Sequence, residues 1–214
     1  MNSKLYLVLI FAFLTFKSHG QKSTKGLFSP YKIGFQYNFG NEKSFLFDDP
    51  DYYYQSHTLK GQLFYPLTDF RKIKIDLVLQ PQIQLIQHQL LNSYYVTPNI
   101  PNYTEKIARF IKRKKISLTA LETSIHFEGK LFKDVHLYIQ IGLGISYINT
   151  ETERLAKGFT FIENGNIGFS IKTSSTTSIQ IHTGIGHVSN FDFQIPNGGY
   201  NTFNSGIGFQ YVLK

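Results

Sequence analysis

The chain has 214 residues, no cysteine and a formal net charge of +8. Because cysteine is absent, disulfide bonds and thiolate metal sites are excluded. Aromatic residues make up 16% of the chain, and 17 glycines accompany them. Beyond the N-terminal apolar run, no segment approaches the roughly 18 consecutive apolar residues that a membrane-spanning helix needs. Any membrane span must therefore consist of strands.

The N-terminus has the parts of a secretory signal. Lys4 supplies a positive charge, residues 5–16 are apolar, and Ser18-His19-Gly20 provides small residues at the positions that a signal peptidase reads. We predict a cleaved signal peptide over residues 1–20, which leaves a single domain over residues 21–214. Since no cysteine follows the apolar run, we expect no lipoprotein anchor.

Eight segments alternate apolar and polar residues with the period of two that strands require. In the clearest of them, Ile73, Ile75 and Leu77 alternate with Lys72, Lys74 and Asp76. One face is apolar and the other is rich in Gln, Asn, Gly and Lys, which suits a barrel that faces lipid outside and water inside. The predicted fold is all-β, an eight-stranded antiparallel transmembrane β-barrel of the outer-membrane type, with strands near residues 31–39, 59–65, 73–85, 117–127, 137–147, 161–171, 179–185 and 203–213.

The links between the segments alternate in length, as periplasmic turns and outer loops do when both termini are periplasmic. The short links are residues 66–70, 129–134 and 173–177, and the long links are residues 40–56, 91–115, 150–158 and 190–202. Two features fit this pattern less well. Pro81 costs the third strand a ladder hydrogen bond, which we expect near its outer end. The chain also ends in Leu213-Lys214 rather than in an aromatic residue.

The candidate site lies where the seventh segment ends, at Gly186-His187-Val188-Ser189-Asn190. Alternate residues of a strand share a face, so His187 and Ser189 point the same way. By parity with Ile181 and Ile185, that face is the lipid side. Histidine beside serine supplies a general base and a nucleophile, provided that a third group orients the imidazole. The simpler interpretation is two polar residues where a strand leaves the membrane.

The same stretch, followed by Pro196-Asn197-Gly198-Gly199 and a glycine-rich last segment, resembles the lipid A 3-O-deacylase (PagL) family. The motif resemblance covers the C-terminal part, and the rest of the chain agrees only in architecture. It implies an eight-stranded outer-membrane barrel whose lipid-facing Ser–His–Glu site hydrolyses the ester-linked acyl chain at the 3-position of lipid A. By this resemblance His187 is the base, Ser189 is the nucleophile, and backbone amides near Asn190 contribute to the oxyanion hole.

Two positions depart from the family's pattern. Asn201 stands at the position of the family's acidic residue, and Asp192 stands where the family has a glycine that contributes to the oxyanion hole. Asparagine orients the histidine in some nucleophilic enzymes, so Asn201 remains compatible with catalysis.

Glu163 is an alternative orienting acid. If the turn between the sixth and seventh segments is centred on Ser175, residue 163 pairs with residue 187. Glu163 then lies opposite His187 on the lipid side, where paired Cβ atoms are about 5 Å apart. We hypothesise that Glu163 orients or charge-stabilises His187. A register shift of one residue would turn Glu163 to the lumen.

Residues 106–115, in the longest link, are rich in cations. Ile107, Phe110 and Ile111 would share one face of a short helix, as in segments that lie on a membrane surface. Contact with lipid A phosphates and a solvated loop are equally good interpretations. The candidate phosphate ligands are Arg109, Lys112, Arg113, Lys114 and Lys115.

We predict no metal site, because the scattered His57, His88, His126 and His136 have no metal-ligand spacing. His182 faces the lumen by parity. The acidic residues of the first long link either bind a cation or belong to a flexible loop; they are Asp48, Asp49 and Asp51. An exported chain with this topology is not expected to bind nucleic acid.

These observations predict a serine esterase that removes a 3-O acyl chain from lipid A at the outer leaflet of a Gram-negative outer membrane. We expect lipopolysaccharide and outer-membrane lipids as its partners and no cofactor, and a homodimer remains open. The main alternative is a non-catalytic barrel, either structural or adhesive or an inactive relative, which Asn201 and Asp192 favour. A small channel is disfavoured because a barrel of about eight strands has an interior just wide enough for side chains to fill.

Overall fold

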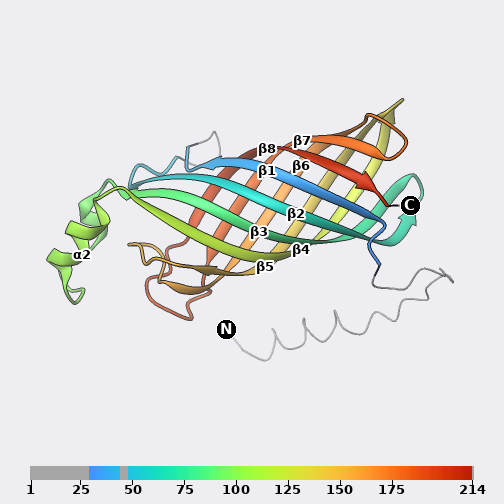
Figure 1. Cartoon of the computed structure of the whole chain (residues 1–214). Coiled ribbons are helices and arrows are strands. Elements are labelled where there is room, and N and C mark those ends of the chain that lie inside the picture. Colours follow the sequence, from blue (N-terminus) through green and yellow to red (C-terminus); the bar gives the residue numbers. More distant parts are fainter. Residues whose placement is uncertain (1–28, 44–47, 214) are drawn as a thin grey trace.

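The computed structural model describes residues 29–43 and 48–213, and the predicted signal peptide lies outside these ranges. The described residues form one closed antiparallel barrel in which each strand pairs with its sequence neighbours and the last strand pairs with the first (Figure 1). The strands are β1 Lys32–Asn41, β2 Tyr52–Phe70, β3 Ile73–Leu90, β4 Lys114–Phe132, β5 Val135–Ile148, β6 Gly158–Lys172, β7 Thr177–Ser189 and β8 Tyr200–Val212. A 3-10 turn, Ser93–Tyr95, and helix α2, Tyr103–Phe110, interrupt the β3–β4 link. The predicted fold class and all eight segments are confirmed.

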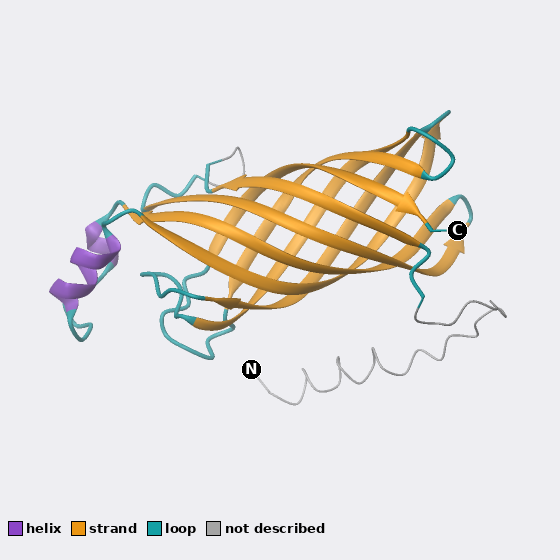
Figure 2. Cartoon of the chain, in the orientation of Figure 1, coloured by secondary structure: helices purple, strands orange, loops and turns teal. Residues whose placement is uncertain are grey.

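The two ends of the barrel differ as the link lengths predict. The turns after β2, β4 and β6 lie at the end that also carries the C-terminus, and α2 extends from the opposite end (Figures 1 and 2). β2 and β4 run on to Phe70 and Phe132, so their turns are tighter than the sequence predicted. In the described part of the chain, no helix is long and apolar enough to cross a membrane.

The alternation of each strand separates an apolar outer face from a polar lumen. In β5, Ile139, Ile141 and Leu143 are exposed, while Gln140 between them is buried. The same pattern recurs around the ring, so exposed large hydrophobic residues cover the outside and buried glutamine, asparagine and serine fill the inside. The predicted orientation of the two faces is therefore confirmed.

Pro81 lies at the middle of β3 rather than near its outer end, which corrects its expected position. The β2–β3 ladder is interrupted opposite Pro81. Lys60 pairs with Gln82, and the pairing resumes at Leu63 and Leu79. Proline has no amide hydrogen to donate, which explains the gap. Gly61 faces Pro81, and a Cβ at Gly61 would lie 3.5 Å from the proline ring.

A buried ion pair is the centre of the luminal network. Lys60 Nζ lies 2.9 Å from Glu122 Oε2, and both side chains are almost wholly buried. Gln80, Gln82 and Asn164 also donate to the Glu122 carboxylate. Burial of a charge is tolerated only when it is paired and hydrogen-bonded in this way.

Removal of one partner of this pair should destabilise the barrel strongly. We expect Glu122→Leu to lower the free energy of unfolding by about 3–5 kcal/mol, because the Lys60 ammonium is left buried and unpaired. The double replacement Lys60→Met with Glu122→Leu should recover most of the loss, because no charge is then stranded. Urea unfolding in detergent micelles measures both values. Equal losses in the single and double variants would contradict the pairing.

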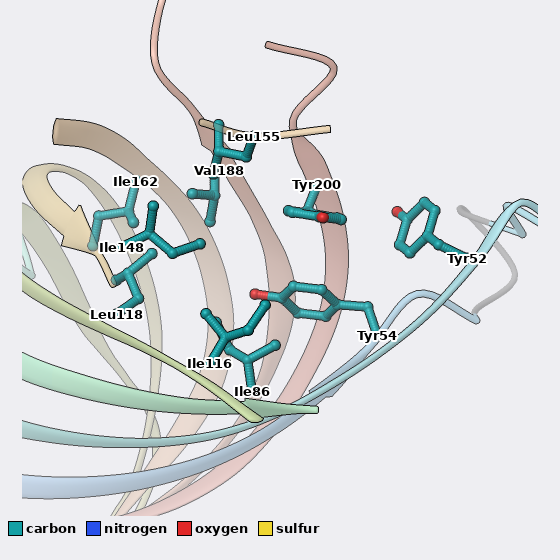
Figure 3. Close-up of a cluster of buried hydrophobic side chains, with 10 residues drawn as sticks. All are labelled: Tyr52, Tyr54, Ile86, Ile116, Leu118, Ile148, Leu155, Ile162, Val188 and Tyr200. Carbon is teal, nitrogen blue, oxygen red and sulfur yellow. The ribbon is translucent and has the colours of Figure 1, made fainter. Parts of the chain in front are cut away.

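At the outer end the lumen changes from polar to apolar. Side chains from seven strands and the β5–β6 link form one buried apolar cluster there (Figure 3). We call this cluster the outer plug; its members are Tyr52, Tyr54, Ile86, Ile116, Leu118, Ile148, Leu155, Ile162, Val188 and Tyr200. Val188 lies between His187 and Ser189 in sequence, and Tyr200 precedes Asn201, so the plug packs against the inside of the wall that carries the candidate site.

Candidate functional site

Three neighbouring strands bring the candidate residues to one level near the outer end. β7 lies between β6 and β8, and His187 pairs with Glu163 of β6 and with Asn201 of β8. The predicted β6–β7 register is thus confirmed. Because paired residues of antiparallel strands point to the same face, the three side chains form a row across the outer surface.

Asn201 occupies the orienting position. Its Oδ1 atom lies 2.7 Å from His187 Nδ1. A carbonyl oxygen only accepts, so Nδ1 carries the proton and Nε2 keeps a free lone pair. That tautomer is the one in which Nε2 takes a proton from a nucleophile.

Ser189 follows His187 on the same face and ends β7. Ser189 is only 8% exposed, and its cross-strand partner on β6 is Phe161. Among the described residues, no hydrogen bond joins the Ser189 side chain to His187. Catalytic hydrogen bonds are often long in the absence of substrate and tighten when it binds.

Glu163 lies across from His187, and no hydrogen bond joins the two side chains within the described ranges. A carboxylate on a directly paired residue acts on an imidazole through charge rather than through a hydrogen bond. Such exposed pairs typically contribute about 0.2–1 kcal/mol. Its role as a charge-stabilising neighbour remains a proposal.

Glu163→Gln tests this proposal. We expect kcat to fall by about two- to fivefold, since the imidazolium that forms in the transition state loses a neighbouring charge. Asn164→Gln, at the next residue, is unsuitable as a control because Asn164 bonds Glu122 in the lumen. Lys172→Gln, near the other end of β6, is the matched control. An unchanged kcat in Glu163→Gln would remove Glu163 from the site.

The link after Ser189 begins with a tight turn. Phe193 N donates to Asn190 O over 3.0 Å, and Phe191 and Asp192 both have positive φ, at 50° and 62°. The Asn190 amide donates to Asn197 Oδ1 at 2.7 Å, and the Asn190 side chain donates to the Gln194 carbonyl. Asn190 therefore holds the link together from a fully buried position.

Two backbone amides of this turn have no acceptor in the described part of the chain, those of Phe191 and Asp192. They are the free donors that follow Ser189, whereas the Asn190 amide is already engaged. Asp192 has a left-handed backbone, which glycine adopts at no steric cost and aspartate tolerates better than most residues.

The segment Pro196-Asn197-Gly198-Gly199 returns the chain to β8 and packs against the histidine. Gly199 has a φ of +64°, and a Cβ there would lie 3.0 Å from His187 Cε1. Any larger residue would press on the imidazole, so this glycine shapes the site.

An aromatic surface that no sequence pattern indicated lies beside Ser189. Phe161 contacts Phe159, Phe191 and Phe193, with ring centroids 4.9, 4.7 and 6.1 Å apart respectively. Phe193 is 70% exposed and Ile195 is 92% exposed. We call Phe159, Phe161, Phe191 and Phe193 the aromatic patch. It offers an apolar contact surface on the β6 side of the site.

The first part of the basic segment lies in helix α2, where Phe110 is buried and Ile107 packs against the same cluster. Lys114 and Lys115, expected in the link, are the first residues of β4. Ile111, expected on that face, is the C-cap and is exposed. Arg109 and Lys106 pair with Glu151 of the β5–β6 link. Burial acts to raise the pKa of Glu151, but hydrogen bonds from Arg109 and Lys106 outweigh it and hold the pKa below its usual range.

The remaining candidate cations differ in their surroundings. Lys114 Nζ donates to the Glu151 carbonyl, and the Arg113 guanidinium lies 4.3 Å from the Tyr53 ring centroid. Lys112 and Lys115 have no ion pair within the described residues. Arg109 and Lys114 are thus partly committed to contacts within the chain.

The acidic residues of the first long link do not form a metal cluster. In the described ranges, no group of three or more His, Asp or Glu side chains is arranged to hold a metal ion. Asp49 and Asp51 instead lie 2.8 and 3.6 Å from the Arg154 guanidinium. His182, predicted to face the lumen, lies there 2.6 Å from Asn38.

Comparison with known proteins shows the family of this chain. The family model described as lipid A 3-O-deacylase (PagL) matches residues 92–210, more than half of the chain. A search of curated protein sequences finds no match.

Solved structures share the fold at low sequence identity. The outer membrane enzyme PagL superposes with a TM-score of 0.51 at 8% identity, covering 85% of this chain and 99% of that one. Neisserial surface protein A has a TM-score of 0.46 at 8% identity, covering 85% and 96%. OprG from Pseudomonas aeruginosa has a TM-score of 0.45 at 9% identity, covering 86% and 97%.

Proposed function

Because this chain belongs to the lipid A 3-O-deacylase (PagL) family and is a β-barrel of the Gram-negative outer membrane, we propose that it is itself a serine esterase. The proposed reaction is hydrolysis of the ester-linked 3-O acyl chain of lipid A at the outer leaflet. The observation that carries the proposal is the 2.7 Å contact between Asn201 Oδ1 and His187 Nδ1, which leaves Nε2 free on the face that Ser189 shares.

The proposed mechanism has two stages. In the first, Ser189 Oγ attacks the ester carbonyl while His187 Nε2 takes the hydroxyl proton. The tetrahedral intermediate collapses, the sugar 3-hydroxyl leaves with the proton from His187, and the acyl chain stays on Ser189. In the second, water attacks the acyl-enzyme with His187 again as base, which releases a fatty acid and restores Ser189.

The amides of Phe191 and Asp192 support oxyanion stabilisation. The carbonyl oxygen becomes negative in each tetrahedral intermediate, and donors already held by a rigid turn stabilise that charge without reorganisation. The hydrogen bonds that Asn190 donates to Asn197 and Gln194 make this turn rigid. The Asp192 side chain accepts from Asn197 Nδ2 at 3.0 Å, which turns its carboxylate toward the link.

The surroundings of Ser189 suit a substrate embedded in a leaflet. The aromatic patch adjoins Ser189 and gives an acyl chain a contact surface. Lys112, Arg113 and Lys115 of the basic segment remain candidates for lipid A phosphates, with Arg109 and Lys114 as further cations in the same segment. Phosphate attracts such cations through charge and hydrogen bonds.

Mass spectrometry of lipid A from cells that express this chain tests the proposal. We expect the loss of one ester-linked acyl chain, and no loss in cells that express Ser189→Ala at the same level. Unchanged lipid A in both, with the barrel folded in the membrane, would instead support the non-catalytic alternative. Asn201 in place of the family's acid and the unbonded Ser189 hydroxyl are the observations that favour that alternative.

A further inference from the structure

A pocket with both polar and apolar walls opens beside the candidate site, on its β8 side. Its volume is about 240 Å³, and it lies between the β1–β2, β5–β6 and β7–β8 links. It shares Gly199 and Asn201 with the surroundings of His187. Its lining residues are Asp48, Asp49, Pro50, Tyr52, Arg154, Gly198, Gly199 and Asn201.

Arg154 organises this pocket. Its guanidinium lies 4.4 Å from the ring centroids of both Tyr52 and Tyr95, and Asp49 and Asp51 pair with it. The side chain is 11% exposed. The Arg154 carbonyl also accepts from the amides of Gly198 and Gly199, at 2.6 and 3.2 Å. The residue therefore links the wall of the pocket to the segment that packs against His187.

The lining chemistry selects a class of ligand. Carboxylates of Asp48 and Asp49 accept hydrogen bonds, the Arg154 guanidinium donates them, and the Tyr52 ring adds an apolar face. Hydroxyl and amide groups of a sugar need both donors and acceptors, whereas a phosphate would be repelled by the two carboxylates. The volume is below the roughly 300–1,000 Å³ of pockets that enclose a drug-sized ligand, so it suits a single ring.

The pocket and the aromatic patch lie on opposite sides of the catalytic pair. The patch adjoins Ser189 through Phe161 of β6, and the pocket adjoins His187 through Asn201 and Gly199 of β8. We propose that this pocket binds the amino-sugar ring that carries the scissile ester. This inference rests on the proposed esterase function. The ester then lies over Ser189 with its sugar toward β8 and its acyl chain toward β6.

The test compares two substrates that differ in the sugar. One is lipid A in detergent micelles, and the other is p-nitrophenyl palmitate, an acyl ester without a sugar. We expect Arg154→Ala to lower the ratio of kcat/KM for lipid A to kcat/KM for the simple ester by at least about tenfold. Asp49→Asn, a milder change, should lower the same ratio by about threefold. Arg71→Ala, at a periplasmic turn, is the matched control and should leave the ratio unchanged.

Equal losses on both substrates would overturn the assignment of the pocket to the sugar ring. An unchanged ratio in both pocket variants that fold would also overturn it. The heat-dependent shift of the folded barrel on a gel shows whether each variant folds, and Asp49→Asn carries the test if Arg154→Ala does not.

A binding measurement separates this inference from the proposed function. If the wild-type protein cleaves neither substrate, the esterase proposal fails, and the affinity of the Ser189→Ala protein for lipid A micelles then tests the pocket alone. We expect Arg154→Ala in that background to raise Kd by at least about fivefold. An unchanged Kd would overturn the assignment of the pocket.

Discussion

Ser189→Ala and His187→Ala, each made alone, are expected to lower kcat for deacylation by on the order of ten-thousand-fold. Ser189 supplies the nucleophile and His187 Nε2 its base, so either change removes the same step. The double replacement should therefore cost no more than either single one. Release of fatty acid from lipid A by the purified protein measures all three rates.

Two substitutions on the same strand are controls for this experiment. Ser178→Ala and His182→Gln remove a serine and a histidine from β7 without touching the outer row, because Ser178 is near the periplasmic turn and His182 faces the lumen. Both should keep the wild-type rate within about twofold. Additive losses in the Ser189 and His187 variants would show that the two residues do not act as a unit.

Asn201→Asp is expected to raise kcat by about tenfold or more. The asparagine amide holds the His187 tautomer but carries no charge, whereas a carboxylate also stabilises the imidazolium that forms when Ser189 is deprotonated. The reverse change, from aspartate to asparagine, costs about ten-thousand-fold in a serine protease because it favours the wrong tautomer. Asn201 Oδ1 faces His187 Nδ1 and holds the right tautomer, so we expect a smaller effect here. The measurement is kcat on lipid A micelles at neutral pH.

Asn201→Asp made together with Glu163→Gln gives a second test of this prediction. If Glu163 supplies the charge while Asn201 supplies the orientation, Asn201→Asp should give a larger gain in Glu163→Gln than in the wild type. Asn201→Gln, which keeps an amide but lengthens it, should lower the rate because the Nδ1 contact is lost. A fall in rate for Asn201→Asp would show that the neutral orienting group is required.

Much of the barrel could be predicted because each strand obeys two constraints at once. Lipid outside requires apolar side chains, and a packed lumen requires small or hydrogen-bonding ones, so the period of two persists through every strand. The short β6–β7 turn, in which Thr173 N donates to Thr177 O, then fixes the register. That is why Glu163 could be placed opposite His187 before the fold was known.

The surroundings of the site could not be predicted, because they depend on contacts between links that have no periodic pattern. Leu155 of the β5–β6 link forms a β-bridge with Asn197 of the β7–β8 link, and this pairing brings Arg154 to its pocket. The aromatic patch likewise requires Phe191 and Phe193 to fold back onto β6. Arg109 was expected to face solvent or phosphate, but Glu151 approaches it from another link.

The outer plug has a consequence for the cell envelope. The tilted rings of Tyr54 and Tyr200 lie with their centroids 4.8 Å apart in the mouth of the barrel, and Leu155 and Ile162 belong to the same buried cluster. Apolar side chains packed in the mouth oppose the entry of water-soluble solutes, so we expect abundant copies of this protein to leave the permeability barrier intact. Cells that overproduce it should therefore remain as resistant to bulky antibiotics as cells without it, apart from any change that follows from altered lipid A.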